Sequence, residues 1–320
     1  MTPGVSVVIC TYNRVDRLGE TLRTLAAADP PARTEWELIV VDNNSTDSTG
    51  ALVEIVARRF PCPLRYVFEP QQGKSFALNS GIAHARGDIL AFTDDDVLIG
   101  KNWLSALWRA FHETECAGVG GRIQAEWTVP RPSWYTASGP FRLMNIVSGE
   151  YDYGPTRSVV GPDRPPFGAN MAWRRSVFQT YGVFRTDLGY AGRARLGGED
   201  TEYSRRVLVA GELVVYEPEA LVRHVVEPEK LTKAFFRHRY YNYGRVLARV
   251  DQGPSLLRRY FGIPRYLFRD LATHATRWAL ASSGQARFYH DLQCWQLFGA
   301  AVESVRLHRA QGGGRRGARA

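Results

Sequence analysis

The sequence predicts an α/β protein whose mostly parallel sheet is flanked by helices and followed by a helical C-terminal extension. Two observations predict this fold class. In the first third of the chain, short apolar runs alternate with segments whose apolar residues recur at helical spacing, which is typical of a parallel sheet with covered faces. After residue 230, aromatic residues and arginines recur at helical spacing without intervening strands.

The first third of the chain supplies the predicted parallel strands and the helices between them. Each strand is a short apolar run, and each helix carries apolar residues near helical spacing. Prolines end the first two helices, and Arg86-Gly87-Asp88 turns the chain after the third. In chain order, we expect strands at 5–10, 37–41, 64–68 and 89–92, and helices at 16–28, 48–60 and 74–85.

The rest of the chain is less regular. The segment 130–166 is rich in proline, glycine, serine and aromatic residues, which predicts a long ordered loop or lid. Regular elements are expected as strands at 119–123 and 221–226 and as helices at 201–210, 231–249 and 255–281. The glycine- and arginine-rich end predicts disorder. The predicted domains are therefore 1–230, a basic and aromatic-rich helical extension at 231–310, and a disordered tail at 311–320.

The composition is that of a soluble globular protein, with 44% hydrophobic and 23% charged residues. No apolar run approaches the roughly 20 residues of a membrane span. The start of the chain lacks a basic region, and the apolar run 5–10 is too short for a signal peptide. The four cysteines are scattered and form no CxxC pair, which argues against a zinc site or a disulfide framework. We expect a cytoplasmic protein.

The net charge of +9 is unevenly distributed along the chain. Residues 230–320 carry 17 Lys and Arg against 4 Asp and Glu, whereas residues 1–229 carry 24 against 28. A basic C-terminal third suits an anionic partner such as lipid headgroups, a phosphorylated carrier or nucleic acid. The alternative is a set of solvated, arginine-rich helix faces.

Three consecutive carboxylates, Asp94, Asp95 and Asp96, follow the apolar strand 89–92. Adjacent carboxylates repel one another, and folding alone does not require such a cluster at the end of a strand. A divalent cation that bridges to a diphosphate would offset this repulsion, because it binds carboxylate oxygens. The alternative is a solvated acidic turn that caps the next helix near Trp103.

Polar residues also follow the other strands, and ligands of parallel sheets collect at the carboxyl ends of the strands. Asp42 is placed to accept hydrogen bonds from a base or a ribose, while Asp47 or Ser48 is expected to cap the next helix. Lys74, just before the third helix, is placed to reach a phosphate. The upstream glycine of a phosphate loop is absent, since position 68 is Phe, so that motif is excluded.

A second acidic pair, Glu199 and Asp200, follows two glycines that allow close approach of the backbone to a ligand. One interpretation is a general base, which accepts a proton from an attacking hydroxyl. The other is an acidic first turn of a helix, favoured by the helix dipole. His224 lies in a strand-like run; it is either a structural residue or, as a neutral imidazole, part of a metal shell with the acidic triplet.

Five motifs in order resemble the family 2 nucleotide-sugar glycosyltransferases, which have the glycosyltransferase A fold, a Rossmann-like sheet flanked by helices. The resemblance covers residues 5–230. It implies inverting transfer from a nucleoside diphosphate sugar, assisted by Mg²⁺ or Mn²⁺, in cell-envelope polysaccharide or glycoconjugate synthesis. The motifs are VVICTYNR at 7–14, VVDNNSTD at 40–47, GKSFALNSG at 73–81, DDD at 94–96 and GED at 198–200.

The resemblance also implies roles for individual residues. The pattern Asp94-x-Asp96 matches the DxD signature of the family, with Asp96 as metal ligand and Asp94 and Asp95 facing ribose or metal. Asp200 matches the base, and Glu199 supports it or orients the acceptor. Residues 167–171 resemble an acceptor-side segment, and His224 lies where some members place a metal-linked histidine. The donor nucleotide is expected at Thr11, Tyr12, Asn13, Arg14, Asp42 and Lys74.

Two other functions remain open from the residues alone. A sugar nucleotidyltransferase also uses a metal-bearing strand end, but the pair Glu199-Asp200 has no obvious task there. A non-catalytic nucleic-acid binder could use the aromatic residues of the basic third, but the acidic strand ends disfavour it, and we expect no nucleic-acid partner. We expect a saccharide or lipid-linked acceptor, with the basic third in peripheral contact with an anionic membrane at its inner face.

Overall fold

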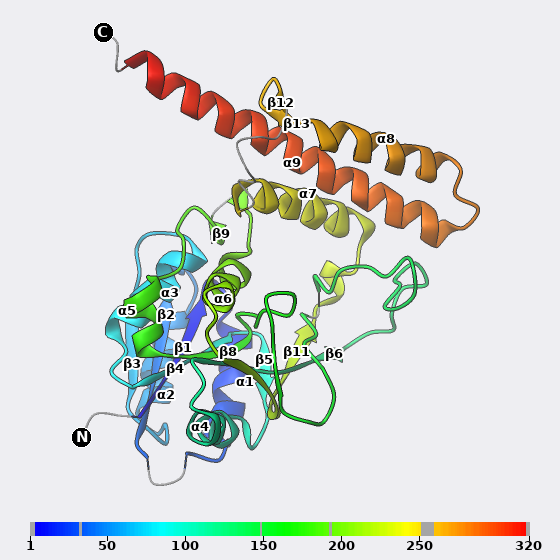
Figure 1. The fold of residues 1–320 in the computed structure, drawn as a ribbon. Helices are drawn as coiled ribbons and strands as arrows, with labels where there is room; N and C mark the ends of the chain where they lie inside the picture. Colours follow the sequence, from blue (N-terminus) through cyan, green and yellow to red (C-terminus); the bar gives the residue numbers. More distant parts are fainter. Residues whose placement is uncertain (1–3, 32–33, 148, 192–193, 251–258, 318–320) are drawn as a thin grey trace. The chain divides into compact units, whose positions relative to one another are not determined.

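The computed structural model describes residues 4–31, 34–147, 149–191, 194–250 and 259–317. These residues form two compact units (Figure 1). Unit 1 comprises residues 1–126, 148–194 and 199–226, and unit 2 comprises residues 127–147, 195–198 and 227–320. Part of the predicted loop 130–166 and residues 195–198 thus belong to unit 2.

Unit 1 is a mixed sheet flanked by helices (Figure 1). The strand order is β3-β2-β1-β4-β8-β6-β11-β5, and β7 pairs with β11. The pairs β3-β2, β2-β1 and β1-β4 are parallel, whereas β4-β8, β8-β6 and β11-β5 are antiparallel. The strands are β1 (Val5–Thr11), β2 (Trp36–Asp42), β3 (Leu64–Phe68), β4 (Ile89–Asp94), β5 (Val97–Ile99), β6 (Gly118–Trp127), β7 (Ser158–Val159), β8 (Asn170–Arg174) and β11 (Val214–Val226).

Helices pack closely on this sheet because its central strands are apolar on both faces. Every residue of β2 is buried, as expected for a central parallel strand. Gly81 of α3 lies so close to β1 that an added Cβ would meet Val8 Cγ1 at 2.4 Å. The helices of this unit are α1 (Val15–Ala26), α2 (Thr49–Ala57), α3 (Lys74–His84), α4 (Trp103–Thr114), α5 (Arg175–Tyr181) and α6 (Glu199–Val209).

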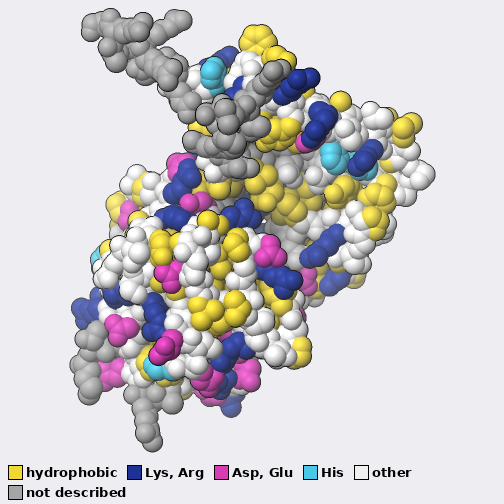
Figure 2. Space-filling view, viewed as in Figure 1, with side chains coloured by type: hydrophobic (Ala, Val, Ile, Leu, Met, Phe, Trp, Pro, Cys, Tyr) yellow, Lys and Arg dark blue, Asp and Glu magenta, His cyan; other side chains and the backbone are white. Residues whose placement is uncertain are grey.

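Unit 2 is helical. Its long helices α7 and α9 pack together, and α8 packs on α9 (Figure 1). Hydrophobic and basic side chains lie next to one another on its surface (Figure 2). Among the described residues, no helix combines the length and the apolar composition needed to cross a membrane. The elements are η1 (Pro228–Lys230), α7 (Lys233–Val250), β12 (Arg259–Tyr260), β13 (Ile263–Pro264), α8 (Arg265–Ala279) and α9 (Gly284–Gly317). Two short paired strands, β9 (Tyr190–Ala191) and β10 (Ala194–Arg195), lie between α5 and α6 in the chain.

Most predicted elements are present, with boundaries shifted by a few residues. The prediction of one helix over 255–281 is wrong. Residues 259–264 form a hairpin and the helix begins only at Arg265, while 251–258 lie outside the described residues. The predicted helical extension at 231–310 included α9 but gave no bounds for it; α9 contains Gly284 and Gly299, residues of low helix propensity. This helix continues to Gly317, into the segment whose composition predicts disorder.

Two glycines bring the backbones of α7 and α9 together. A Cβ added at Gly244 would lie 1.8 Å from the Gln296 carbonyl oxygen, and one added at Gly299 would lie 2.0 Å from the Tyr241 carbonyl oxygen. Backbone atoms cannot yield as a flexible side chain can. The packing of the two helices therefore depends on the absence of side chains at both positions.

Gly244→Val is expected to destabilise unit 2 by about 3 kcal/mol or more, because two helix backbones would have to separate. Chemical denaturation monitored by circular dichroism measures the change. Gly284→Ala is the matched control, since no atom lies within 4 Å of a Cβ added there. Equal stability of the two variants would contradict the close helix packing.

Candidate functional site

The register of the parallel strands places the predicted polar residues at one edge of the sheet. Thr11 at the end of β1 pairs with Asp42 at the end of β2, and Cys10 pairs with Asp94 at the end of β4. The three strand ends therefore lie side by side, as expected from the sequence. The connections that leave these ends carry the remaining candidate residues.

Asp42 is buried and held by two hydrogen bonds. The Tyr66 hydroxyl donates to Asp42 Oδ2 at 2.7 Å, and the Ser45 backbone amide donates to Asp42 Oδ1 at 2.9 Å. Burial and the bond to Asp42 raise the pKa of Tyr66 to about 12. Tyr66 was not predicted as part of the site. It lies within β3 in no motif, and only the pairing of β3 with β2 brings it to Asp42.

The loops after β1 and β2 are tied together by Asn13. Its backbone is left-handed, with φ of 52°, a conformation that asparagine tolerates. Asn13 Oδ1 accepts a hydrogen bond from the Thr46 amide at 2.7 Å, and the Asn13 amide donates to Ser45 Oγ at 2.9 Å. Tyr12, predicted beside it, has an exposed side chain. The two loops thus form one continuous wall beside Asp42.

Asp47 organises the starts of two helices. Its Oδ1 accepts a hydrogen bond from the Thr49 amide and its Oδ2 from the Val15 amide, each at 3.1 Å. These amides open α2 and α1, so the predicted capping role is confirmed for Asp47 and extends to a second helix. The Ser48 side chain makes no such bond.

Two of the three carboxylates of the acidic triplet, Asp95 and Asp96, are buried. The Thr11 hydroxyl donates to Asp95 Oδ2 at 2.7 Å, and Arg14 Nη1 lies 2.6 Å from Asp96 Oδ2 and 3.3 Å from Asp95 Oδ1. Burial and the charge of Asp96 raise the pKa of Asp95 to about 7, although Arg14 and Thr11 oppose this. The alternative of a solvated acidic turn is therefore wrong.

His224 joins the triplet because β11 pairs with β5 and places it opposite Val97. His224 Nε2 lies 3.4 Å from Asp96 Oδ1. Asp94, Asp96 and His224 each offer one ligand atom, and these atoms lie within 4.8 Å of one another. Two carboxylates and an imidazole are a donor set that could hold a divalent cation.

Lys74 connects the triplet to the second acidic pair. Its Nζ donates to Asp94 Oδ1 at 2.7 Å and lies 3.9 Å from Glu199 Oε1. Burial lowers the pKa of Lys74, but the charges of Asp94, Glu199 and Asp200 outweigh burial and raise it well above its usual value. In this structure Lys74 thus contacts carboxylates. Acidic residues from β4 and α6 thus meet around the half-buried Lys74, whose side chain is 23% exposed.

Asn43 positions Lys74, although it was not singled out from the sequence. Its Oδ1 accepts a hydrogen bond from the Gly73 amide at 2.8 Å, and its Nδ2 donates to the Gln71 carbonyl at 2.8 Å. These bonds fix the loop before α3, which begins at Lys74. The position of Asn43, directly after Asp42 at a strand end, is the signal that could have identified it.

Glu199 and Asp200 open α6 after two glycines in left-handed conformation, Gly197 and Gly198. Asp200 Oδ2 accepts a hydrogen bond from the Gly168 amide at 2.7 Å, and its Oδ1 accepts one from the Thr201 amide at 2.6 Å. The predicted acceptor-side segment 167–171 therefore lies beside Asp200. The two backbone amides thus fix both oxygens of the Asp200 carboxylate.

Glu199 is buried, and its Oε2 has no hydrogen-bond partner among the residues that the structure describes. Burial and the charge of Asp200 raise the pKa of Glu199 to about 7, even though Lys74 opposes the shift. Such a carboxylate carries a proton near neutral pH in the folded protein.

The stability of the protein is expected to depend on this proton. Between the unfolded pKa of 4.5 and the folded pKa of about 7, the folded state binds more protons, so stability falls as the pH rises. Glu199→Gln removes this term and should gain up to about 3 kcal/mol relative to wild type between pH 5 and pH 8. Urea denaturation at both pH values measures it. A difference that does not change with pH would contradict the shift.

A further buried residue, Asn170, holds the sheet edge together. Its Nδ2 donates to the Ala220 carbonyl at 2.7 Å and to the Arg122 carbonyl at 2.9 Å, and its Oδ1 accepts from Trp103 Nε1 at 2.8 Å. It thus links β8 to β6, β11 and α4. Asn170 supports the segment 167–171 rather than facing a ligand.

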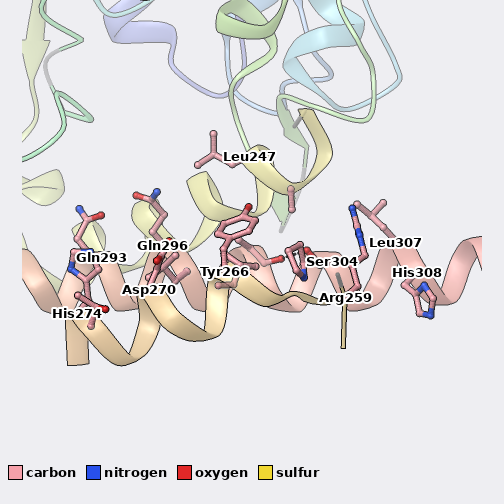
Figure 3. Close-up of a pocket in the computed structure, with 16 residues that line it drawn as sticks. Leu247, Arg259, Tyr266, Asp270, His274, Gln293, Gln296, Ser304, Leu307 and His308 are labelled. Atoms are coloured by element: carbon pink, nitrogen blue, oxygen red, sulfur yellow. Dashed lines mark hydrogen bonds between the residues drawn. The ribbon is translucent and has the colours of Figure 1, made fainter. Parts of the chain in front are cut away.

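A separate cavity of about 660 Å³ lies in unit 2 among α7, α8 and α9 (Figure 3). Tyr266, Asp270 and His274 of α8 line it together with residues of α7 and α9. The residues drawn there include none of those predicted for donor, metal or catalysis. The cavity is therefore distinct from the sheet edge.

Comparisons with known proteins agree with this geometry. The family model described as glycosyl transferase family 2 matches residues 6–182. The succinoglycan biosynthesis protein ExoM of Rhizobium meliloti is 32% identical over 254 residues, which are 78% of this chain and 77% of that protein. The glucosyl-dolichyl phosphate glucuronosyltransferase of Haloferax volcanii is 26% identical over 69% of this chain and 68% of that protein.

Solved structures share the fold of this chain. The mannosyltransferase PcManGT from Pyrobaculum calidifontis, in complex with GDP-Man and Mn²⁺, has a TM-score of 0.62 at 21% identity, covering 95% of this chain and 88% of that one. TarS 1–349 of S. aureus, in complex with UDP, has a TM-score of 0.54 at 18% identity and covers 96% and 91% of the two chains. This likeness is one of fold.

Proposed function

The chain belongs to glycosyl transferase family 2, and we propose that it transfers a sugar from a nucleoside diphosphate sugar to an acceptor hydroxyl with inversion, using Asp200 as the base. The glycosyltransferase A fold and the enzyme class predicted from the sequence are confirmed. The observation that supports the proposed mechanism is the position of Lys74, whose ammonium lies near both Asp94 and Glu199. It therefore links the acidic triplet to the residue next to Asp200.

The donor nucleotide is proposed to lie along the wall formed by the loops after β1 and β2. Asp42 offers a buried carboxylate to ribose or base, and its bond to Tyr66 fixes its orientation. Thr11 and Asn13 shape the wall, while Arg14 and Lys74 bring positive charge to its edge. These two cations are suited to a diphosphate, although both contact carboxylates in this structure.

The cation is proposed to be held by Asp96, Asp94 and His224. When bound, it supplies a positive charge that offsets the charge developing on the leaving diphosphate. The protein residues around it keep the carboxylates in place. Thr11 holds Asp95, and Lys74 holds Asp94. The site therefore needs little rearrangement of its backbone.

In the proposed reaction, the Asp200 carboxylate takes the proton of the acceptor hydroxyl. The acceptor oxygen forms a bond to the anomeric carbon while the bond between that carbon and the diphosphate oxygen breaks. A single in-line displacement inverts the configuration. The Gly168 amide fixes one Asp200 oxygen in space, which positions the base beside the segment 167–171. Glu199 next to it is proposed to orient the acceptor.

The acceptor is proposed to be a saccharide or a lipid-linked saccharide in polysaccharide or glycoconjugate synthesis. Two relatives support this class by their names, one in succinoglycan biosynthesis and one acting on a glucosyl-dolichyl phosphate. A cytoplasmic enzyme, peripheral at the inner face of the membrane, would meet such an acceptor. Family membership argues against both a sugar nucleotidyltransferase and a non-catalytic nucleic-acid binder.

A thermal-shift screen of nucleoside diphosphate sugars, each with and without Mn²⁺, tests the donor proposal. The cognate donor with Mn²⁺ is expected to stabilise the protein by about 2.7 kcal/mol at a hundred times its dissociation constant. The same donor with a chelator should give a much smaller shift. A donor that stabilises equally in both conditions would contradict the metal-assisted site.

A further inference from the structure

Unit 2 carries an exposed surface that the transfer reaction does not use. We propose that this surface docks on an anionic lipid bilayer. It consists of the tip of the β12–β13 hairpin and one face of α8, and we call it the basic-aromatic patch. The inference rests on unit 2 alone and does not depend on the proposed reaction. The patch comprises Arg259, Tyr260, Phe261, Arg265, Phe268 and Arg269.

The hairpin tip presents an aromatic side chain that the fold does not require. Phe261 and Gly262 form the two-residue turn, with φ of 51° and 85°. Such a turn favours asparagine or glycine at its first position, and a bulky side chain is unfavourable there. Phe261 is nevertheless 91% exposed, so it contributes little to any core. An aromatic side chain in this position suits insertion between lipid headgroups.

The base of the hairpin is held against α9, which gives the tip a fixed support. A Cβ added at Gly262 would lie 2.6 Å from His308 Cβ, so the turn backbone lies directly on the helix. Strand β13 contacts both α8 and α9. Phe261 therefore projects from a packed base. Hydrophobic and basic side chains lie side by side in this part of unit 2 (Figures 1 and 2).

The adjoining face of α8 is exposed along its length. Arg265, Phe268, Arg269 and Ala272 follow the spacing i, i+3, i+4 and i+7, which places them on one face, and all are exposed. Leu267 is the buried residue of this helix. The rings of Tyr260 and Phe268 lie 6.4 Å apart, so the helix face and the hairpin tip are continuous.

The charge of the patch selects its partner. Three arginines stand against one acid, Asp270, which pairs with Arg269 at 2.9 Å. A second copy of this chain would bring the same positive charge to the contact and would be repelled. Phosphate headgroups are complementary to it, because guanidinium groups bind phosphate with matched geometry. Stacking on nucleic-acid bases normally combines aromatic side chains with a groove, whereas the hairpin is a protruding tip.

Sedimentation with vesicles tests the proposal on the full chain. Vesicles of phosphatidylcholine with about a third phosphatidylglycerol are expected to bind the protein at low salt, with loss of binding in high salt and to pure phosphatidylcholine. Arg265→Gln/Arg269→Gln should weaken binding by about twenty-five-fold, at about fivefold per arginine. Phe261→Ser should weaken it without removing the salt dependence.

Matched controls distinguish a specific effect of the patch from a general loss of positive charge or of exposed apolar surface. Arg58→Gln and Val209→Ser change a strongly exposed arginine of α2's C-cap and a 70% exposed valine of α6, both in unit 1, and should bind as wild type. Thermal melting of every variant confirms that it folds. No binding to anionic vesicles at low salt would overturn the proposal, as would patch variants that bind as well as the controls. A dimer or a nucleic-acid complex that only the patch variants lose, without any vesicle binding, would assign the patch to that partner instead.

Discussion

Asp200→Asn is expected to lower the rate of sugar transfer by about a thousandfold while donor binding stays within about twofold of wild type. A general base contributes about a hundredfold to ten-thousandfold to such a rate. Asparagine keeps the size of the side chain and can still accept a hydrogen bond from the Gly168 amide. The substitution removes the capacity to take a proton, and it also replaces the oxygen that accepts from the Thr201 amide by an NH2 group.

A transfer assay and calorimetric titration of the donor measure the two quantities separately. Glu202→Gln is the matched control, because it changes a carboxylate in the first turn of the same helix that pairs with Arg206. It should transfer sugar at the wild-type rate. A fully active Asp200→Asn variant would refute the base assignment. Equal loss of donor binding would mean that Asp200 serves the donor.

Asp96→Ala is expected to abolish the metal dependence of donor binding, weakening Mn²⁺-supported affinity by at least about a hundredfold. Asp96 is buried, and its carboxylate lies between the arginine of the β1 loop and His224. Its removal leaves the cluster with one carboxylate and one imidazole. Two such ligands are too few to hold a cation against water in competition with free nucleotide.

Calorimetry of Mn²⁺ alone and of donor with and without a chelator measures this effect. Asp88→Ala, just before the opposite end of β4, is the control and should bind both ligands as wild type. Donor affinity that responds to the chelator equally in Asp96→Ala and wild type would contradict the metal site. This test does not depend on the role of Asp200, which is proposed to act on the acceptor.

The first third of the fold was predictable because each strand and helix there has a clear local pattern and the strands pair in parallel. Strand β11 was harder, since it begins at Val214 and continues through Glu217 and Pro218, which interrupt any apolar pattern. Glu217 is tolerated because Arg157 pairs with it at 2.6 Å. That partner is distant in sequence, so no local rule reveals it.

In the candidate site, too, the sequence predicted what depends on local pattern and missed what depends on contacts between distant residues. Strand ends predicted Asp42 and the acidic triplet, because parallel strands end at one edge of the sheet. The contact of Tyr66 with Asp42 depends on strand register, and the contact of Lys74 with Glu199 depends on where α6 begins in space. The hairpin at 259–264 was missed although Gly262 and Pro264 are residues that break helices. These two residues indicated a break in the helix, but the helical spacing of the aromatic residues and arginines around them was given more weight.

Arg14 gives the resting protein a permanent counter-charge. Its guanidinium lies against Asp96 and Asp95, so these buried acids are partly neutralised before any ligand arrives. A cation that entered the site would therefore replace the Arg14 guanidinium beside these carboxylates, and would not be the first positive charge to reach them. If the proposed donor binds here, its diphosphate would offer the displaced guanidinium a new anion, and the binding of nucleotide and of cation would then reinforce each other.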